Sequence, residues 1–173
     1  MTLTLDATIG GSNSNTYITL ADAETVMEGV FYKDNWDAAT DANKNIALVQ
    51  ATRMLDEKMN WYGSRTDPDD QALEFPRWNC PMKPGSDGYF DYFDNDIIPT
   101  WLENATAIMA DSILGSNRGA DSDTMGFKRI KVDVLELEVD KYDRPGVLPD
   151  AVFDIVKFYG TQASSSLVSL VRN

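Results

Sequence analysis

The sequence predicts a mainly α-helical fold: a small helical bundle with a short β-hairpin, a long connector between two helices and an extended C-terminal tail. Three observations support this class. Apolar residues recur at helical spacing in four segments, each beside a helix start or stop signal. A proline-rich, aromatic stretch over residues 63–98 separates two of these segments. Apolar residues over 127–139 alternate and change phase once, as two strands joined by a tight turn would.

The first two predicted helices have clear N-terminal signals. Thr19 is a good N-cap for a helix that ends before Gly29, and Thr40 or Asp41 caps a second helix that extends to about Met59. The second helix carries an apolar stripe at positions i, i+3, i+7 and i+11, formed by Leu48, Ala51, Leu55 and Met59. Before both helices, residues 2–5 alternate polar and apolar side chains, which predicts a short edge strand.

The connector over residues 63–98 is unusual because it is both long and aromatic. Connectors of this length without regular structure are usually functional or disordered, and aromatic side chains are typical of covered surfaces. Residues 79–95 within it form an aromatic, acidic segment. We therefore expect the connector to pack on the helices and to present a surface.

The rest of the chain contains a third helix, the hairpin and a last helix. Pro99 lies in the first turn of the third helix, and Gly115 ends it. The hairpin turns near residues 133–134, and the last helix ends at Gly160. These signals divide the chain into a helical-bundle domain, residues 1–160, and a C-terminal tail, residues 161–173.

The charge of the chain narrows the possible functions. Lys and Arg number 15 against 28 Asp and Glu, which gives a net charge of −13, and histidine is absent. Proteins that grip nucleic acid normally carry a basic patch, and histidine is the commonest general base and transition-metal ligand. We expect no enzyme activity and no catalytic, cofactor-binding or metal-binding residues. The single cysteine, Cys80, excludes an internal disulfide framework, and no apolar run approaches the roughly 18 residues of a membrane span.

The order of short motifs along the chain resembles the head–tail adaptor, or connector, proteins of tailed bacteriophages. The motifs are Asn-Thr-Tyr-Ile-Thr at 15–19, Ala-Thr-Arg-Met-Leu-Asp at 51–56, Trp-Tyr-Gly-Ser-Arg-Thr at 61–66, Gln-Ala-Leu-Glu-Phe-Pro-Arg at 71–77, Ile-Pro at 98–99 and the ending at 167–172. Members of this family are often labelled DnaT-like single-stranded DNA-binding proteins. The charge of −13 favours the adaptor interpretation over that label.

The resemblance implies a virion structural protein of the neck, made in the cytoplasm of the host bacterium. It implies a ring, usually a dodecamer, that contacts the portal protein and the next tail or neck protein, while double-stranded DNA passes through without specific binding. The tail would dock on the portal through Leu167, Val168, Leu170, Val171 and Arg172. Contacts between subunits or rings would fall on Trp61, Tyr62, Arg65, Phe75, Arg77, Trp78, Tyr89, Phe90, Tyr92 and Phe93. Arg53, Arg65 and Arg77 are candidates for ion pairs that hold the connector against acidic neighbours.

A replication-associated single-strand binder is the alternative. Its basic groove would come from Arg118, Lys128, Arg129 and Lys131. Aromatic residues at 61, 62, 75 and 78 would stack bases in such a protein, but acidic neighbours such as Asp67 and Asp70 favour a packing role.

Two further interpretations concern the acidic residues. The aspartates at 67–70 and 91–96 suit calcium by ligand type, but neither matches the spacing of an EF-hand, so we interpret them as solvated turns. A carboxylate-based hydrolase would need two acids in one pocket, and no spacing in the chain requires that.

Overall fold

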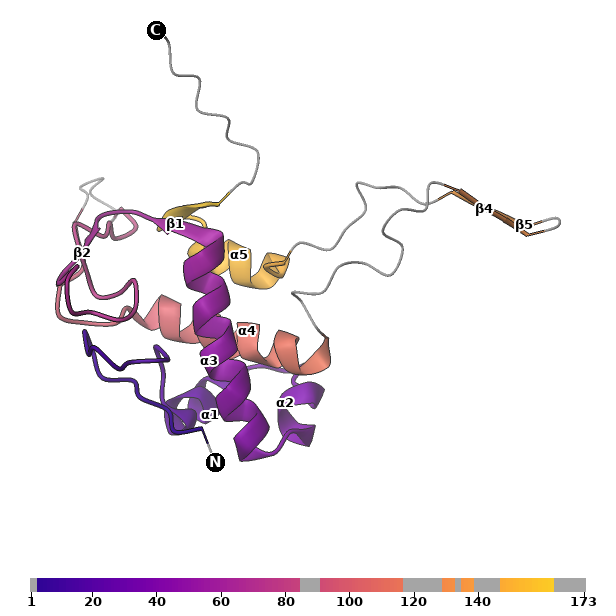
Figure 1. Cartoon of the computed structure of the whole chain (residues 1–173), viewed down its shortest axis with the longest axis horizontal. Helices are drawn as coiled ribbons and strands as arrows, with labels where there is room; N and C mark the ends of the chain where they lie inside the picture. Colours follow the sequence, from indigo (N-terminus) through magenta and orange to yellow (C-terminus); the bar gives the residue numbers. More distant parts are fainter. Residues whose placement is uncertain (1–2, 85–90, 117–128, 133–134, 139–146, 164–173) are drawn as a thin grey trace, which may run out of the picture.

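The computed structural model describes residues 3–84, 91–116, 129–132, 135–138 and 147–163 (Figure 1). Over these residues the fold is mainly α-helical with short two-stranded sheets, as the sequence predicts. The helices are α1 (Leu20–Glu28), α2 (Asp34–Ala38), α3 (Asp41–Lys58), α4 (Thr100–Gly115) and α5 (Asp150–Val156). No helix in this part of the chain is long and apolar enough to cross a membrane.

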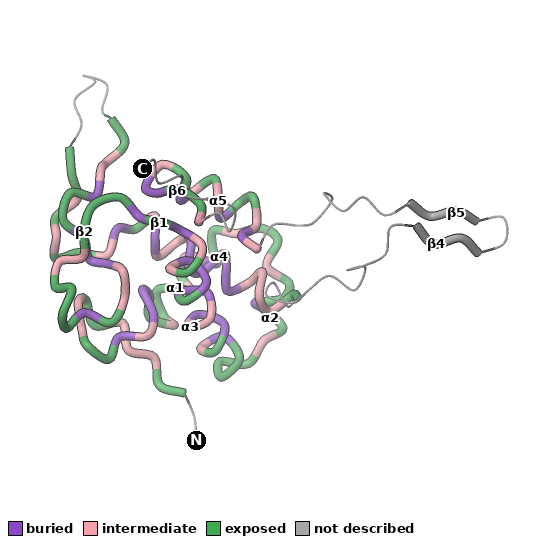
Figure 2. Tube along the Cα trace, turned by 45° about the horizontal axis from the view of Figure 1, so that its top comes forward, coloured by how far each residue is buried: buried purple, intermediate pink, exposed green. Residues whose placement is uncertain are grey.

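Helix α4 is the centre of the packing, since α1, α2, α3 and α5 all contact it (Figure 1). Small residues on α4 such as Ala105 and Ala107 are fully buried and allow this close approach. Figure 2 shows the buried positions concentrated on the inner sides of these helices. The largest buried apolar side chains of the core are Ile18, Met27, Trp36, Leu48, Leu55, Phe75, Leu102, Met109, Val152 and Val156.

The predicted helix starts are confirmed. Thr19 caps α1 by accepting a hydrogen bond from the backbone N–H of Asp22, and Thr40 caps α3 by accepting one from Asn43. Pro99 lies immediately before α4. These signals act within one turn of helix, which is why they could be read from the sequence.

Helix α2 was not predicted, because tertiary contacts of Trp36 hold it in place. The backbone N–H of Trp36 donates to the Asp111 carboxylate at 2.9 Å, and its indole N–H donates to Glu24 at 3.0 Å. Lys44 of α3 donates to the same Glu24 at 2.6 Å. A helix of five residues is too short to be stable by local propensity alone.

One small antiparallel sheet joins segments that are distant in sequence, and a second lies inside the connector. Strand β1 (Met59–Trp61) continues directly from α3 and pairs with β6 (Gly160–Gln162), with Asn60 opposite Thr161. Strands β2 (Ser64–Arg65) and β3 (Arg77–Trp78) pair inside the connector. The connector is therefore folded back on itself beside the helices.

The predicted hairpin near residues 127–139 is confirmed as strands β4 (Arg129–Val132) and β5 (Leu135–Glu138). Their register places Arg129 opposite Glu138 and Lys131 opposite Glu136. The last helix is shorter than predicted, because α5 ends at Val156 and Gly160 begins β6. Residues 3–5 form no strand, unlike the predicted edge strand at 2–5.

Candidate functional site

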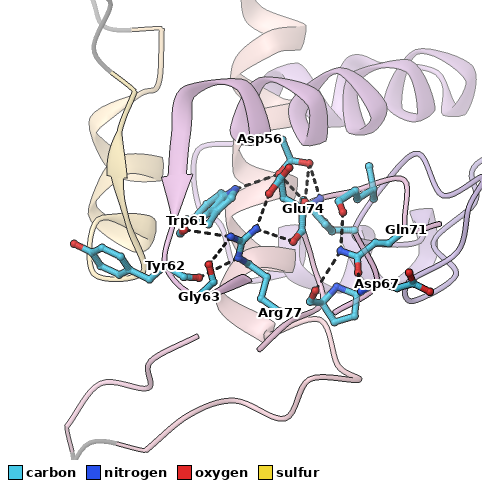
Figure 3. A network of polar contacts seen from close by, with 11 residues as sticks. Asp56, Trp61, Tyr62, Gly63, Asp67, Gln71, Glu74 and Arg77 are labelled. Atoms are coloured by element: carbon cyan, nitrogen blue, oxygen red, sulfur yellow. Dashed lines mark hydrogen bonds and ion pairs between the residues drawn. The ribbon is translucent and has the colours of Figure 1, made fainter. Parts of the chain in front are cut away.

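The side chain of Arg77, in β3, organises the turn between β1 and β2 (Figure 3). It is buried, and its guanidinium donates to three successive backbone carbonyls: Trp61 at 3.3 Å, Tyr62 at 3.0 Å and Gly63 at 2.8 Å. The same group also donates to the Glu74 backbone carbonyl at 3.1 Å and to its carboxylate at 2.5 Å. A buried guanidinium is tolerated only when its donors are used in this way. The predicted ion pair of Arg77 is confirmed by this contact.

Gly63 permits the turn to lie directly against β3. Its φ angle is +78°, in the left-handed region, and a Cβ there would lie 2.1 Å from the backbone carbonyl oxygen of Trp78. Only glycine accommodates both the backbone conformation and this approach. The contact places the backbone of Tyr62, the preceding residue, beside that of Trp78.

Tyr62 and Trp78 both expose their rings, and we call them the exposed aromatic pair. They are 45% and 49% exposed, whereas Trp61 and Phe75 are buried. Successive side chains of an extended strand alternate between faces, so Trp61 points inward and Tyr62 outward. Figure 3 shows the Tyr62 ring directed away from the polar network around Arg77. The aromatic residues of the connector thus divide into a core set and a surface set.

The core set packs against α4 and thereby supports the part of the connector that carries the surface set. Trp61 contacts Phe75 edge-on at 5.4 Å between ring centroids, and Phe75 contacts Trp101 of α4 at 5.6 Å. Trp101 in turn stacks on Tyr159 at 3.9 Å, with the rings 5° from parallel. The backbone carbonyl of Tyr159 accepts a 2.9 Å hydrogen bond from the N–H of Tyr62. The exposed aromatic pair is therefore tied to α4 and to the segment after α5.

Asp56, near the end of α3, fixes the same region from the other side. Its carboxylate accepts hydrogen bonds from the Tyr17 hydroxyl at 2.6 Å, the Trp61 indole N–H at 3.2 Å and the Glu74 backbone N–H at 3.3 Å. Burial raises the pKa of Asp56 to about 6, although these hydrogen bonds act in the opposite direction.

Gln71 completes the polar network at the base of the connector (Figure 3). Its side-chain amide donates to the carbonyls of Leu73 at 2.7 Å and Pro76 at 3.2 Å, and its oxygen accepts from the N–H of Asp67. The side chain is buried, so one residue closes the loop that Asp67 begins.

The connector that carries the exposed aromatic pair also carries the cationic side chains of Arg65 and Lys83. Arg65 is opposite Arg77 in the β2–β3 register, and its Nε has no hydrogen-bond partner among the described residues. Lys83 is exposed, with its ammonium 6.0 Å from the ring centroid of Tyr159. The exposed residues Asp67, Asp69 and Asp70 follow closely in the same connector. The local charge is therefore mixed.

The structure separates the residues that the sequence grouped as contacts. Tyr62, Trp78 and Tyr92 are exposed, Arg65 and Phe93 are partly buried, and Trp61, Phe75 and Arg77 are buried. Tyr89 and Phe90 lie outside the described residues, as do Leu167, Val168, Leu170, Val171 and Arg172. For Arg53 and Arg65 the structure gives no ion pair with another described residue.

One exposed aromatic group was missed. Phe31 and Tyr32, between α1 and α2, are 88% and 82% exposed, with centroids 5.0 Å apart. No periodicity marks this short connection, so the sequence carried no signal for it. Among the described residues, no group of three or more Cys, Asp or Glu side chains is arranged to hold a metal ion.

A family model described as "Putative DnaT-like ssDNA binding protein" matches residues 1–173. The chain belongs to this family. Comparison with curated proteins and with solved structures found no significant match.

Membership in the DnaT-like family corrects the leading expectation from sequence. The interpretation as a head–tail adaptor is wrong, and the family match does not support the expected virion structural role, dodecameric ring or portal and tail partners. The net charge of −13 does not outweigh the family match. Net charge is a sum over the whole chain, whereas stacking of bases depends on which rings a local surface exposes.

The basic groove proposed for the alternative is not assembled by the described residues. Arg129 and Lys131 lie on β4, each with a glutamate opposite it in β5. Arg118 and Lys128 are outside the described residues.

Proposed function

We propose that this protein binds single-stranded DNA as a non-enzymatic accessory factor, by stacking bases on Tyr62 and Trp78. The observation that carries the proposal is the family match over the whole chain. The exposed aromatic pair supports it, because aromatic rings that successive bases can stack on are the common element of sequence-tolerant single-strand binders.

The fixed position of the two rings favours binding. Arg77 holds the carbonyl of Tyr62, and Gly63 lies against the carbonyl of Trp78, so both backbones are ordered before DNA arrives. A surface that is already ordered loses little conformational entropy on association. Stacking of one base on an aromatic side chain contributes about 1–3 kcal/mol.

The charge distribution sets the character of the binding. Arg65 and Lys83 are cations of the same connector, and the exposed carboxylates of Asp67, Asp69 and Asp70 would repel the phosphates. Phosphate contacts supply most of the affinity of basic single-strand binders. We therefore expect weaker binding here, with most of the free energy from stacking.

The test is fluorescence anisotropy with a labelled oligothymidine of about 20 nucleotides. Tyr62→Ala and Trp78→Ala should each weaken binding by about 5- to 150-fold, which corresponds to the loss of one stacked base at about 1–3 kcal/mol. Stacking of a base on Trp78 should also quench the tryptophan fluorescence of the wild-type protein. This quenching should be absent from Trp78→Phe.

Phe31→Ala is the matched control, because Phe31 is an even more exposed ring outside the connector. It should bind the oligonucleotide as the wild-type protein does. Equal affinities for wild-type, Tyr62→Ala and Trp78→Ala proteins would exclude the exposed aromatic pair as the binding surface. No binding by the wild-type protein at low salt would exclude the function itself.

A further inference from the structure

A groove runs along α3, and neither Tyr62 nor Trp78 lines it. Its floor is formed by α3 side chains from Ile46 to Lys58, and Leu3 and Val147 border it. The groove has a volume of about 510 Å³. Ile46 is 53% exposed and Leu3 is 42% exposed, so apolar surface faces solvent there.

The chain passes one end of this groove at Ala163. Strand β6 runs antiparallel to β1, and the N–H of Ala163, the next residue, donates to the carbonyl of Lys58 at 2.8 Å. Lys58 is the last residue of α3 and lines the groove. The ten residues that follow Ala163 therefore start where the groove begins.

The length of this segment matches the groove. From Lys58 back to Ile46, α3 rises about 18 Å, at 1.5 Å per residue. From Ala163 to Leu170 an extended chain reaches about 23 Å, at about 3.3 Å per residue. The apolar residues of the segment, Leu167, Val168, Leu170 and Val171, can thus reach any position between Met54 and Ile46.

We propose that residues 164–173 occupy the α3 groove of their own chain, with the apolar side chains of the segment covering Ile46 and Leu3. Burial of apolar surface from both sides supplies the driving force. The segment is an intramolecular strap in this assignment, and it is independent of the proposed DNA binding.

Disulfide trapping in the full chain tests the proposal. Gln50 lines the groove and Ser169 stands between the apolar residues of the segment, so Gln50→Cys with Ser169→Cys leaves the apolar contacts intact. The native Cys80 does not interfere, because it is buried and its pKa is raised to about 11, which keeps the thiol protonated. The readout is the rate at which the intrachain disulfide forms in a glutathione redox buffer, followed by intact mass and non-reducing electrophoresis.

The matched control carries the same two cysteines with Leu167→Ser and Leu170→Ser. We expect the intrachain disulfide to form at least tenfold faster with the native segment than with this control, independently of protein concentration. Equal rates would overturn the proposal, as would an interchain disulfide that increases with concentration, since the segment would then occupy a second copy. Oligonucleotide binding is measured in a separate experiment. A failure of DNA binding therefore leaves the disulfide-trapping result interpretable, and a failure of trapping leaves the DNA-binding result interpretable.

Discussion

The guanidinium of Arg77 lies beneath the backbone of Tyr62, with Nε donating a 3.0 Å hydrogen bond to the Tyr62 carbonyl. One buried side chain thereby holds the backbone of a residue whose ring is exposed. The arrangement explains how a connector with little regular structure presents a defined aromatic surface.

Arg77→Gln should destabilise the fold by about 3 kcal/mol. The change removes the guanidinium from the carbonyls of Trp61, Tyr62 and Gly63 and leaves buried acceptors unpaired, and loss of one partner in a buried charged network typically costs about 3–5 kcal/mol. The lower end applies because Glu74 is partly exposed and can be resolvated. Urea unfolding followed by tryptophan fluorescence measures the change.

Arg53→Gln is the control for Arg77, because Arg53 is an exposed arginine on α3. Its effect should stay within about 0.5 kcal/mol, as for other surface substitutions. Arg77→Lys should recover only part of the stability, since an ammonium cannot reproduce the planar fork of donors. A similar small effect for Arg77→Gln and Arg53→Gln would mean that the network contributes little.

Gly63→Ala should destabilise the protein by about 1–3 kcal/mol and weaken oligonucleotide binding. Alanine at a φ of +78° is strained, and its Cβ would meet the Trp78 carbonyl oxygen at 2.1 Å, so the turn must move away from β3. Thermal unfolding and anisotropy measure the two effects.

Gly29→Ala serves as the comparison for Gly63→Ala. Gly29, after α1, has a φ of −82°, and a Cβ there would be 3.4 Å from the nearest atom, the carbonyl oxygen of Val26. Stability and binding should both be preserved. If Gly63→Ala were equally well tolerated, the close approach of the turn to β3 would be dispensable for the exposed aromatic pair.

The parts of the fold that the sequence predicted are those governed by local interactions. Thr19 and Thr40 cap their helices through hydrogen bonds within three residues, and the phase change in the apolar pattern separates the paired strands β4 and β5. The pairing of β1 with β6 joins Asn60 to Thr161, and neither short segment carries a pattern that names its partner. Helix α2 likewise depends on the contact between Trp36 and Asp111.

The sequence identified the region of the candidate site, but it did not distinguish the exposed aromatic residues from the buried ones. The aromatic run over 61–78 was identified as unusual, yet composition alone does not distinguish the buried Trp61 from the exposed Tyr62, because that depends on where β1 begins its alternation. The sequence favoured the wrong function because net charge, like composition, is a property of the whole chain. A charge of −13 describes the whole chain, whereas the connector that carries the exposed aromatic pair holds the cations Arg65 and Lys83 as well as a group of aspartates.

Oligonucleotide binding should depend weakly on salt. For single-stranded DNA, each phosphate contact contributes about −0.7 to the slope of log K against log salt concentration. Contacts from Arg65 and Lys83 therefore predict a slope between about −0.7 and −1.4. Arg65→Gln should reduce the magnitude of the slope by about 0.7. Anisotropy titrations over a series of NaCl concentrations give the slope directly.

Lys33→Gln is the control for the salt experiment, because Lys33 pairs with Asp37 on α2, outside the connector. It should leave the slope unchanged. A steep slope, of about −3 or beyond, would indicate four or more phosphate contacts. The exposed aromatic pair and its two cations could not then account for binding.

Asp56 should make stability depend on pH between about 4 and 6. Burial raises its pKa from the ordinary aspartate value of 3.8 to about 6 in the folded protein, so the folded state holds more protons than the unfolded state in this range. The free energy of unfolding therefore falls as pH rises, by up to about 3 kcal/mol for a difference of about two pKa units. Above pH 6 the Asp56 carboxyl is ionised in both the folded and the unfolded protein, so it no longer contributes to the pH dependence of stability.

Asp56→Asn isolates the effect, because asparagine does not titrate and keeps one oxygen as an acceptor for Trp61 or Tyr17. Glu103 and Asp111, whose pKa values are also raised by burial, contribute equally to both proteins, so only the difference between the two stability curves belongs to Asp56. We expect that difference to change by up to about 3 kcal/mol between pH 4 and pH 6 and to be constant above it. A carboxyl ¹³C titration should place the pKa of Asp56 near 6. A titration midpoint near 3.8, with parallel stability curves, would show that the hydrogen bonds from Tyr17, Trp61 and Glu74 offset the cost of burying the charge.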